Sequence, residues 1–345
     1  MNVVEAPLRG SLNNAFNAFN VFQRLQRFQL LFRYVIRRIL ALIPTTVGVL
    51  LLTFVLFHVV GGSPAEVVLG QHANAEAIAE FNARFGYDKP LLIGPAGDRF
   101  GSQLFFYLWS LLRGDFGYSS AYGMRVADVL RGGVGPSLSI TVPILILGTA
   151  LALMLAMTAA AWRGRWPDRA VLFGSTLLMS VNYVVWILAG QFLLSYKLRL
   201  FPIWGFEGVA YILLPVIIGV FSGLGRDIRF FRTVILDELG RPYVRTAISK
   251  GLSRRRVLWG HVFRNSLIPV VTYVSLSIPY LFTGSLLLES FFGIPGLGGV
   301  TINAINSSDM ATVRAVVVLG SLLYQAVHLV TDICYAWLDP RVRMV

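Results

Sequence analysis

Long stretches without charged residues alternate with short charged segments along most of the chain. An ionised side chain at the centre of a bilayer costs at least about 2.5–3.5 kcal/mol, so these gaps mark candidate membrane spans. The six gaps are 17 to 31 residues long, whereas a helix needs roughly 20 residues to cross the hydrocarbon core. The pattern predicts an all-α polytopic membrane protein with six transmembrane helices, near residues 39–61, 137–162, 170–196, 208–226, 265–288 and 314–334.

Basic residues lie mainly on one side of this predicted membrane. Segments 1–38, 163–169, 226–264 and 332–345 together contain 21 Lys and Arg, whereas the segments on the opposite side contain 9. Because Lys and Arg concentrate in cytoplasmic loops, we expect both the N and C termini in the cytoplasm.

Two segments outside the predicted spans also contain apolar patterns. Residues 1–33 carry Phe or Leu at every third position from 16 to 28, which favours a helix on the inner membrane surface or a partly ordered tail. The outer segment 62–136 contains apolar runs such as Leu104–Leu112, which indicate a helix at the membrane interface. No linker divides residues 34–345, which we therefore interpret as one membrane domain.

The overall composition supports a membrane protein. Of 345 residues, 56% are hydrophobic and 14% are charged, which argues against a water-soluble enzyme. The net charge of +13 does not indicate a nucleic-acid partner, because nucleic-acid binders cluster their basic residues on a polar chain. Cys334 is the single cysteine, which excludes an intrachain disulfide and a multi-cysteine metal site.

The sequence lacks the residues that would power transport by itself. Every Asp and Glu lies at or outside a predicted span boundary, and only His58 and His328 fall within spans. The phosphate-binding pattern G-x-x-x-x-G-K-[ST] is absent, as are HExxH and G-x-S-x-G. A six-span ion-coupled carrier or channel remains an alternative, and a membrane-embedded hydrolase is a further one.

The predicted cytoplasmic loop 227–264 has the pattern of short helices around a turn. Gly240-Arg241-Pro242 ends one element and places Pro at the first position of the next helix. Gly251 stands where a helix end favours the left-handed conformation, and Ser253 is suited to cap the following helix. Arg254-Arg255-Arg256 opposes the dipole of that helix, which indicates an acidic partner or lipid headgroups. We expect an exposed apolar docking face made of Tyr243, Val244, Ala247 and Ile248.

At these residues the chain resembles the membrane subunits of binding-protein-dependent ABC importers, in the dipeptide, oligopeptide and nickel class. The EAA loop of that class is similar to Tyr243-Val244-Arg245-Thr246-Ala247-Ile248-Ser249-Lys250-Gly251-Leu252. Further motifs match in the correct order over residues 34–345, among them Gly61-Gly62-Ser63-Pro64-Ala65, Leu112-Arg113-Gly114-Asp115-Phe116-Gly117, Phe292-Gly293-Ile294-Pro295-Gly296-Leu297-Gly298 and Asp339-Pro340-Arg341.

The resemblance implies roles for particular residues. Contact with an ATPase is implied for Tyr243, Val244, Arg245, Thr246, Ala247, Lys250, Gly251, Leu252 and Ser253. A motif of the family comprises Glu289, Gly293, Pro295, Gly296 and Gly298. Arg245 stands where the general EAA loop has Glu, a change that this class shares. Ser180-Val181-Asn182-Tyr183 replaces a Ser-x-Pro break, so we expect Asn182 to bend the helix or, with Tyr183, to line the pathway.

The resemblance also implies an assembly in the bacterial inner membrane. The chain would have the type I ABC importer permease fold and would pair with a second homologous permease subunit. Its other partners would be two ABC ATPase subunits or a fused pair, and an extracytoplasmic substrate-binding protein. ATP and Mg would bind to the partner ATPases, so this chain would be non-catalytic, with no cofactor or metal of its own. Peptides or related small solutes would be the transported substrates.

Overall fold

The computed structural model describes residues 33, 36–60, 65, 74–92, 94, 101–283 and 285–338. The segment 1–32 and the C-terminal motif at 339–343 lie outside these residues. The described residues belong to two units, one within 1–48 and 328–345 and the other within 49–327. In the first unit, Arg38 forms an ion pair of 2.9 Å with Asp332 of α14 (Met310–Leu338).

The first described helix, Ile36–Phe57, merges into the π-helical η1 (Val55–Val60). Two short helices follow, α3 (Ala75–Phe85) and α4 (Gln103–Leu112), and each begins at a side-chain cap, Asn74 or Ser102. The predicted helix at 104–112 is confirmed by α4. Strands β1 (Tyr118–Ser119) and β2 (Met124–Arg125) pair antiparallel and form a small hairpin.

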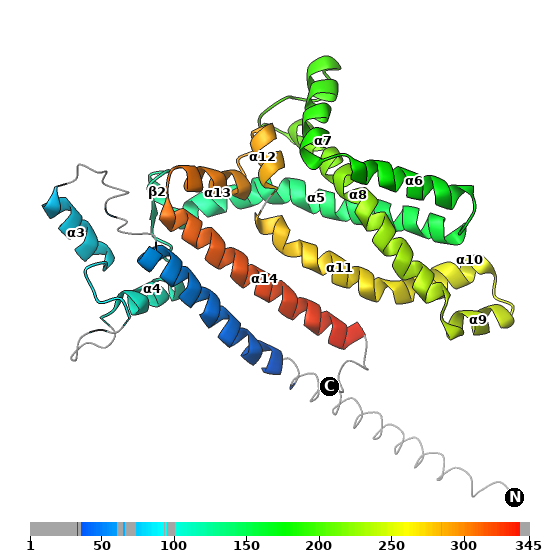
Figure 1. Cartoon of the computed structure of the whole chain (residues 1–345), viewed down its shortest axis with the longest axis horizontal. Coiled ribbons are helices and arrows are strands. Elements are labelled where there is room, and N and C mark those ends of the chain that lie inside the picture. The colour runs from blue at the N-terminus through cyan, green and yellow to red at the C-terminus, as the bar shows by residue number, and fades with distance from the viewer. Residues whose placement is uncertain are drawn as a thin grey trace, which may run out of the picture. The chain divides into compact units, whose positions relative to one another are not determined.

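Helix α5 (Val126–Ala161) is 36 residues long and packs against α6, α8, α11 and α13 (Figure 1). It begins well before the start of the predicted span near residue 137. Asp128 and Arg131 lie in its first turns with exposed side chains, so a charge at this end does not stop the helix.

Helix α6 (Trp166–Ser180) and α7 (Tyr183–Gly190), which η2 (Gln191–Lys197) continues, meet at a bend of 89°. Val181 is extended, and the side chain of Asn182 accepts a hydrogen bond of 2.9 Å from the Val184 N–H. Asn182 is therefore the N-cap of α7, and a capped start replaces the Ser-x-Pro break at this bend.

Helix α8 (Val209–Leu239) starts where the fourth span is predicted to start but continues beyond residue 226 to Leu239. The loop after it contains α9 (Pro242–Ser249), α10 (Arg254–Val257) and η3 (Leu258–Val262), and η3 runs directly into α11 (Phe263–Thr283). The charged residues between 226 and 239 are thus part of α8. A helix that leaves the hydrocarbon core can continue through charged residues in water, so the first charge does not mark its end.

Helices α12 (Leu286–Phe292) and α13 (Leu297–Asn306) are bent by 86° relative to each other. The predicted span 265–288 contains nearly all of α11 and the start of α12. The charge gap did not reveal that α11 ends at Thr283 and α12 begins at Leu286, because the residues between 265 and 288 are all uncharged.

Among the described residues, four helices are long and apolar enough to cross a membrane: Ile36–Phe57, α5, α8 and the Met310–Ile333 part of α14. The number rises to six if the α6–α7 and α12–α13 pairs each count as one span. In the part of the chain that the structure describes, strands occur only in the β1–β2 hairpin. The chain is an all-α polytopic membrane protein, whereas the exact set of six spans and the side of the termini stay predictions.

Three apolar clusters form the core of the larger unit. One joins the C-terminal part of α5 to α8, α9, α10, η3 and α11. A second lies between α5, α7, α8 and α12, and a third connects the start of α5 to α13 and α14. Because α5 and α8 contribute to the first two clusters, they connect the α9 end of the bundle to the α12 end.

Candidate functional site

The chain turns at Gly251 between α9 and α10. Gly251 has a φ of +80°, and its N–H donates a hydrogen bond of 2.9 Å to the Ile248 carbonyl. Ser253 Oγ accepts a hydrogen bond of 3.4 Å from the Arg256 N–H. Pro242 occupies the first helical position of α9. The predicted proline start, left-handed glycine and serine cap are all confirmed.

The apolar face of α9 is largely covered by the chain itself. Val244 and Ala247 are 2% and 8% exposed and pack in the cluster that includes Ile228 and Ile235 of α8 and Val257 of α10. The expectation of a docking face that includes Val244 and Ala247 is therefore wrong, because packing within this cluster already removes both side chains from water. The exposed residues of this segment are Arg245, Thr246, Ile248, Ser249, Lys250, Gly251 and Ser253, and Tyr243 and Leu252 are half-buried.

Tyr243 fastens α9 to the end of α8. Its hydroxyl donates a hydrogen bond of 2.7 Å to Oε2 of Glu238. Burial raises the pKa of the Tyr243 phenol, so at neutral pH the hydroxyl keeps its proton and remains a donor. The position of α9 thus depends on a polar contact as well as on apolar packing.

A basic surface follows the turn. Arg254, Arg255 and Arg256 are exposed, and the last two line a cavity of about 560 Å³ together with Ser253, Trp259 and Gly260. Trp259 is half exposed, so the cavity combines guanidinium groups with an aromatic wall. This surface is chemically suited to acidic groups.

The turn between α12 and α13 encloses the carboxylate of Glu289, which is only 1% exposed. Oε1 accepts hydrogen bonds from Ser137 Oγ at 2.7 Å and from the Ser285 N–H at 3.1 Å. Oε2 accepts from the backbone N–H groups of Gly298 at 2.7 Å and Gly299 at 3.2 Å. Four donors therefore surround one buried carboxylate, which explains how the turn tolerates it.

The glycines of the family motif make room for this arrangement. A Cβ atom on Gly296 would lie 2.4 Å from Cδ of Glu289, and one on Gly293 would lie 2.0 Å from Cε2 of Trp204. Gly293 also has a φ of +67°. A Cβ on Gly298 would lie 2.8 Å from the carboxylate, and Pro295 is exposed in the turn. Gly296 and Gly298 thus leave room for the Glu289 carboxylate, and Gly293 leaves room for Trp204.

A polar cavity of about 420 Å³ lies among α5, α7, α8 and α11. Tyr183 lines it, and its hydroxyl is 3.1 Å from Ser285 Oγ. Asn182 is not among the lining residues. Other hydroxyl groups in the wall come from Thr141, Thr149, Ser222 and Ser277.

These features agree with the similarity of the chain to known proteins. Residues 148–344 match the family described as the binding-protein-dependent transport system inner membrane component, and residues 31–95 match the N-terminal domain of the same kind of membrane component. The chain belongs to this permease family. Similar proteins include the glutathione transport system permease protein GsiC of Salmonella typhimurium, of Escherichia coli K12 and of Shigella flexneri. Each is 32% identical to this chain over 314 residues, which is 90% of this chain and 98% of the relative.

The permease is therefore a subunit of a bacterial ABC importer and is located in the inner membrane. The family match spans the C-terminal part of α5, the loop with α9 and α10, and the Glu289 turn. Both sequence-derived motifs thus lie in the region that defines the family.

The permease also carries a charged pair that sequence reasoning missed. Arg226 and Asp227 line the polar cavity from α8. The charge-gap rule treated Arg226 as the end of a span and so removed both residues from consideration. The sequence did contain a signal that Arg226 could belong to a polar helix face. Ser222 and Arg226 are four residues apart, which places both side chains on the same face of a helix.

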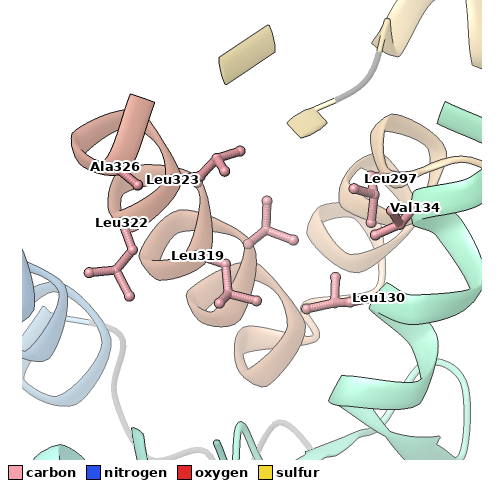
Figure 2. Close-up of a pocket in the computed structure, with 9 residues that line it drawn as sticks. Leu130, Val134, Leu297, Leu319, Leu322, Leu323 and Ala326 are labelled. Carbon is pink, nitrogen blue, oxygen red and sulfur yellow. The ribbon is translucent and has the colours of Figure 1, made fainter. Parts of the chain in front are cut away.

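A second cavity of the permease, of about 430 Å³, has a different character (Figure 2). It lies between α5, α13 and α14, and every lining residue is apolar. Figure 2 shows Leu319 and Leu323 of α14 across the cavity from Leu130 of α5 and Leu297 of α13. Because this cavity offers no side-chain hydrogen-bonding groups, the polar cavity is the better candidate for a hydrophilic solute.

Proposed function

We propose that this permease is one membrane subunit of an ATP-driven importer of small peptides, and that α9 and its turn couple it to a cytoplasmic ATPase. Its partners in this proposal are a second homologous permease subunit, two ABC ATPase subunits or a fused pair, and an extracytoplasmic substrate-binding protein. ATP and Mg bind to the ATPase chains, and hydrolysis takes place there.

The peptide substrate class is supported by the relatives and by the polar cavity. GsiC is named for glutathione transport, and glutathione is a small peptide. The cavity of about 420 Å³ falls within the range of roughly 300–1,000 Å³ typical of small-molecule sites. The hydroxyl groups of Thr141, Ser222 and Ser277 donate their protons to backbone carbonyls, so their oxygens can accept hydrogen bonds from peptide N–H groups.

The coupling role rests on the path from α9 to the cavity. Ile248 is 56% exposed on α9, beside the exposed Arg245 and Ser249. On the opposite face Val244 and Ala247 belong to the same buried cluster as Ile228 and Ile235 of α8, and Tyr243 hydrogen-bonds to Glu238 at the end of α8. Arg226 and Asp227 of the same helix line the polar cavity. A force on α9 would therefore reach the cavity through one continuous helix. This connection is the observation that carries the proposal.

Reconstitution into proteoliposomes with the partner subunits tests the energy source. We expect uptake of labelled dipeptides or glutathione to require internal ATP and to persist when a protonophore and a sodium ionophore collapse the ion gradients. Uptake that stops with the protonophore while ATP stays constant would favour an ion-coupled carrier and overturn the proposal.

Two substitutions on neighbouring residues test the docking surface. Ile248→Asp places a charge on the exposed face, so we expect normal folding, loss of ATPase subunits on purification and loss of uptake. Ala247→Asp buries a charge within the apolar cluster, so we expect reduced thermal stability of the permease itself. Full ATPase binding and wild-type uptake by Ile248→Asp would show that α9 is not the coupling element.

A further inference from the structure

We infer that Arg226 binds a free carboxylate of the solute inside the polar cavity, with Asp227 and Tyr273 as its positioning residues. This inference rests on the proposed import of small peptides and names the chemical group that the cavity recognises. We call these three residues the carboxylate site.

The guanidinium of Arg226 is open to the cavity. The Arg226 side chain is 71% exposed, whereas that of Asp227 is 19% exposed. Arg226 Nε lies 3.6 Å from Oδ1 of Asp227, which is longer than the roughly 2.7–3.2 Å of an N–H···O hydrogen bond. The contact with Asp227 is therefore long. Arg226 also interacts with Tyr273, so the two residues restrain the guanidinium without enclosing it.

The Asp227 oxygen that faces Arg226 is also held by Tyr273. Tyr273 of α11 donates a hydrogen bond of 2.7 Å from its hydroxyl to Oδ1 of Asp227. The Tyr273 ring stacks on Phe230 with 4.4 Å between centroids and meets Phe231 edge-on at 5.6 Å. Because these contacts fix the carboxylate of Asp227, they also limit the positions that the guanidinium can take.

A carboxylate is the group that this geometry favours. The guanidinium is planar and has five donors, and two parallel donors match the two oxygens of a carboxylate. An ionisable residue that faces a cavity within a membrane bundle commonly marks a solute or ion pathway. Ser222, one helical turn before Arg226, and Ser277 of α11 line the same cavity and can hydrogen-bond to the rest of the solute.

The next arginine on α8 is used differently. Arg229 donates hydrogen bonds to Ser175 at 3.1 Å and to Thr176, both on α6. Its guanidinium thus joins two helices, and Arg229 does not line the polar cavity. Arg229 is therefore a matched control for Arg226, with the same charge on the same helix.

The test uses a cysteine reporter in the purified transporter complex. Cys334→Ser removes the native cysteine of this chain, and Ser222→Cys places a thiol one turn from Arg226. The rate at which a charged thiol reagent modifies this introduced thiol is measured on the permease chain after electrophoresis. The ligands are alanyl-alanine and its C-terminal amide, which differ only in the carboxylate.

We expect alanyl-alanine to protect the thiol at a concentration at least about tenfold lower than the amide requires, because one charged hydrogen-bond partner is lost in the amide. Arg226→Gln should abolish this preference, Arg226→Lys should restore part of it, and Arg229→Gln should retain it.

Equal protection by the acid and the amide, or a preference that survives Arg226→Gln, would overturn the carboxylate site. Loss of the preference in Arg229→Gln as well would assign the effect to the fold of α8 and would also overturn it. If the complex takes up the dipeptide but neither compound protects the thiol, the solute binds elsewhere and only this inference fails. If there is neither uptake nor protection, the proposed peptide substrate fails with it.

Discussion

The hydroxyl of Ser137 on α5 donates a hydrogen bond of 2.7 Å to Oε1 of Glu289, 152 positions further along the chain. The same Ser137 oxygen accepts a hydrogen bond of 2.8 Å from the N–H of Leu297, the first residue of α13. One side chain therefore connects α5 to both helices of the α12–α13 turn. The buried carboxylate and this serine together stabilise the 86° bend.

Glu289→Gln should destabilise the permease although it preserves the shape of the side chain. All four partners of the carboxylate are donors, so the new amide NH₂ group would face donors and leave hydrogen bonds unmade. We expect a loss of about 1–3 kcal/mol, measured by thermal or denaturant unfolding in detergent. The control Glu80→Gln, at an exposed position of α3, should change stability by no more than about 0.5 kcal/mol. Equal effects of the two substitutions would contradict this account.

Asp168→Asn should reveal a buried ion pair that joins α6 to α8. Arg232 donates to both oxygens of Asp168 at 2.7 and 2.8 Å, and the Arg232 and Asp168 side chains are 18% and 4% exposed. Removing one partner of such a pair costs about 3–5 kcal/mol, because the remaining charge is buried without compensation. Asp128→Asn breaks an exposed pair of 3.9 Å and should cost at most about 1 kcal/mol. Equal losses of stability from Asp168→Asn and Asp128→Asn would contradict the stronger contribution assigned to the buried ion pair.

Substitutions at Asn182 should show that a side-chain cap maintains the bend between α6 and α7. Asn182→Ala removes the acceptor for the Val184 N–H and should cost about 0.5–2 kcal/mol, whereas Asn182→Asp should keep most of the stability. Asn182→Pro should be tolerated better than Ala, since Asn182 has a φ of −62° and the preceding Val181 is extended, as proline requires. The measurement is thermal unfolding of each variant, and an Ala variant as stable as the Asp variant would disprove the cap.

Gly251→Val should impair the turn through backbone strain alone. No atom lies within 4 Å of the position of a Cβ at Gly251, so the cost of about 1–2 kcal/mol arises from its φ of +80°. Gly251→Asn should be milder, because Asn adopts the left-handed conformation more readily. Gly260→Ala adds a methyl group in open space of a helical segment and serves as the control. We expect the largest loss of stability and of ATPase retention for Gly251→Val, a smaller loss for Gly251→Asn and none for Gly260→Ala. Wild-type behaviour of Gly251→Val would show that the turn is not strained.

Local chemistry allowed several details to be predicted from sequence. Proline at the start of α9, the left-handed Gly251 and the Ser253 cap each follow from the conformational preference of a single residue. The apolar face of α9 was recognised as well, but its use was misjudged. A pattern of four apolar residues cannot show whether the chain itself or another protein covers them.

The sequence by itself determined the class of this protein, because the cost of placing charge in a bilayer is a local property of each segment. It also determined where the family motifs stand, since these are short runs of adjacent residues. Only the tertiary structure decided that Glu289 is enclosed by Ser137 and the glycine turn, that Val244 and Ala247 are buried, and that Arg226 faces a cavity. The physical reason is that burial and hydrogen bonding depend on which distant segments meet, and a charge-gap pattern contains no information about those contacts.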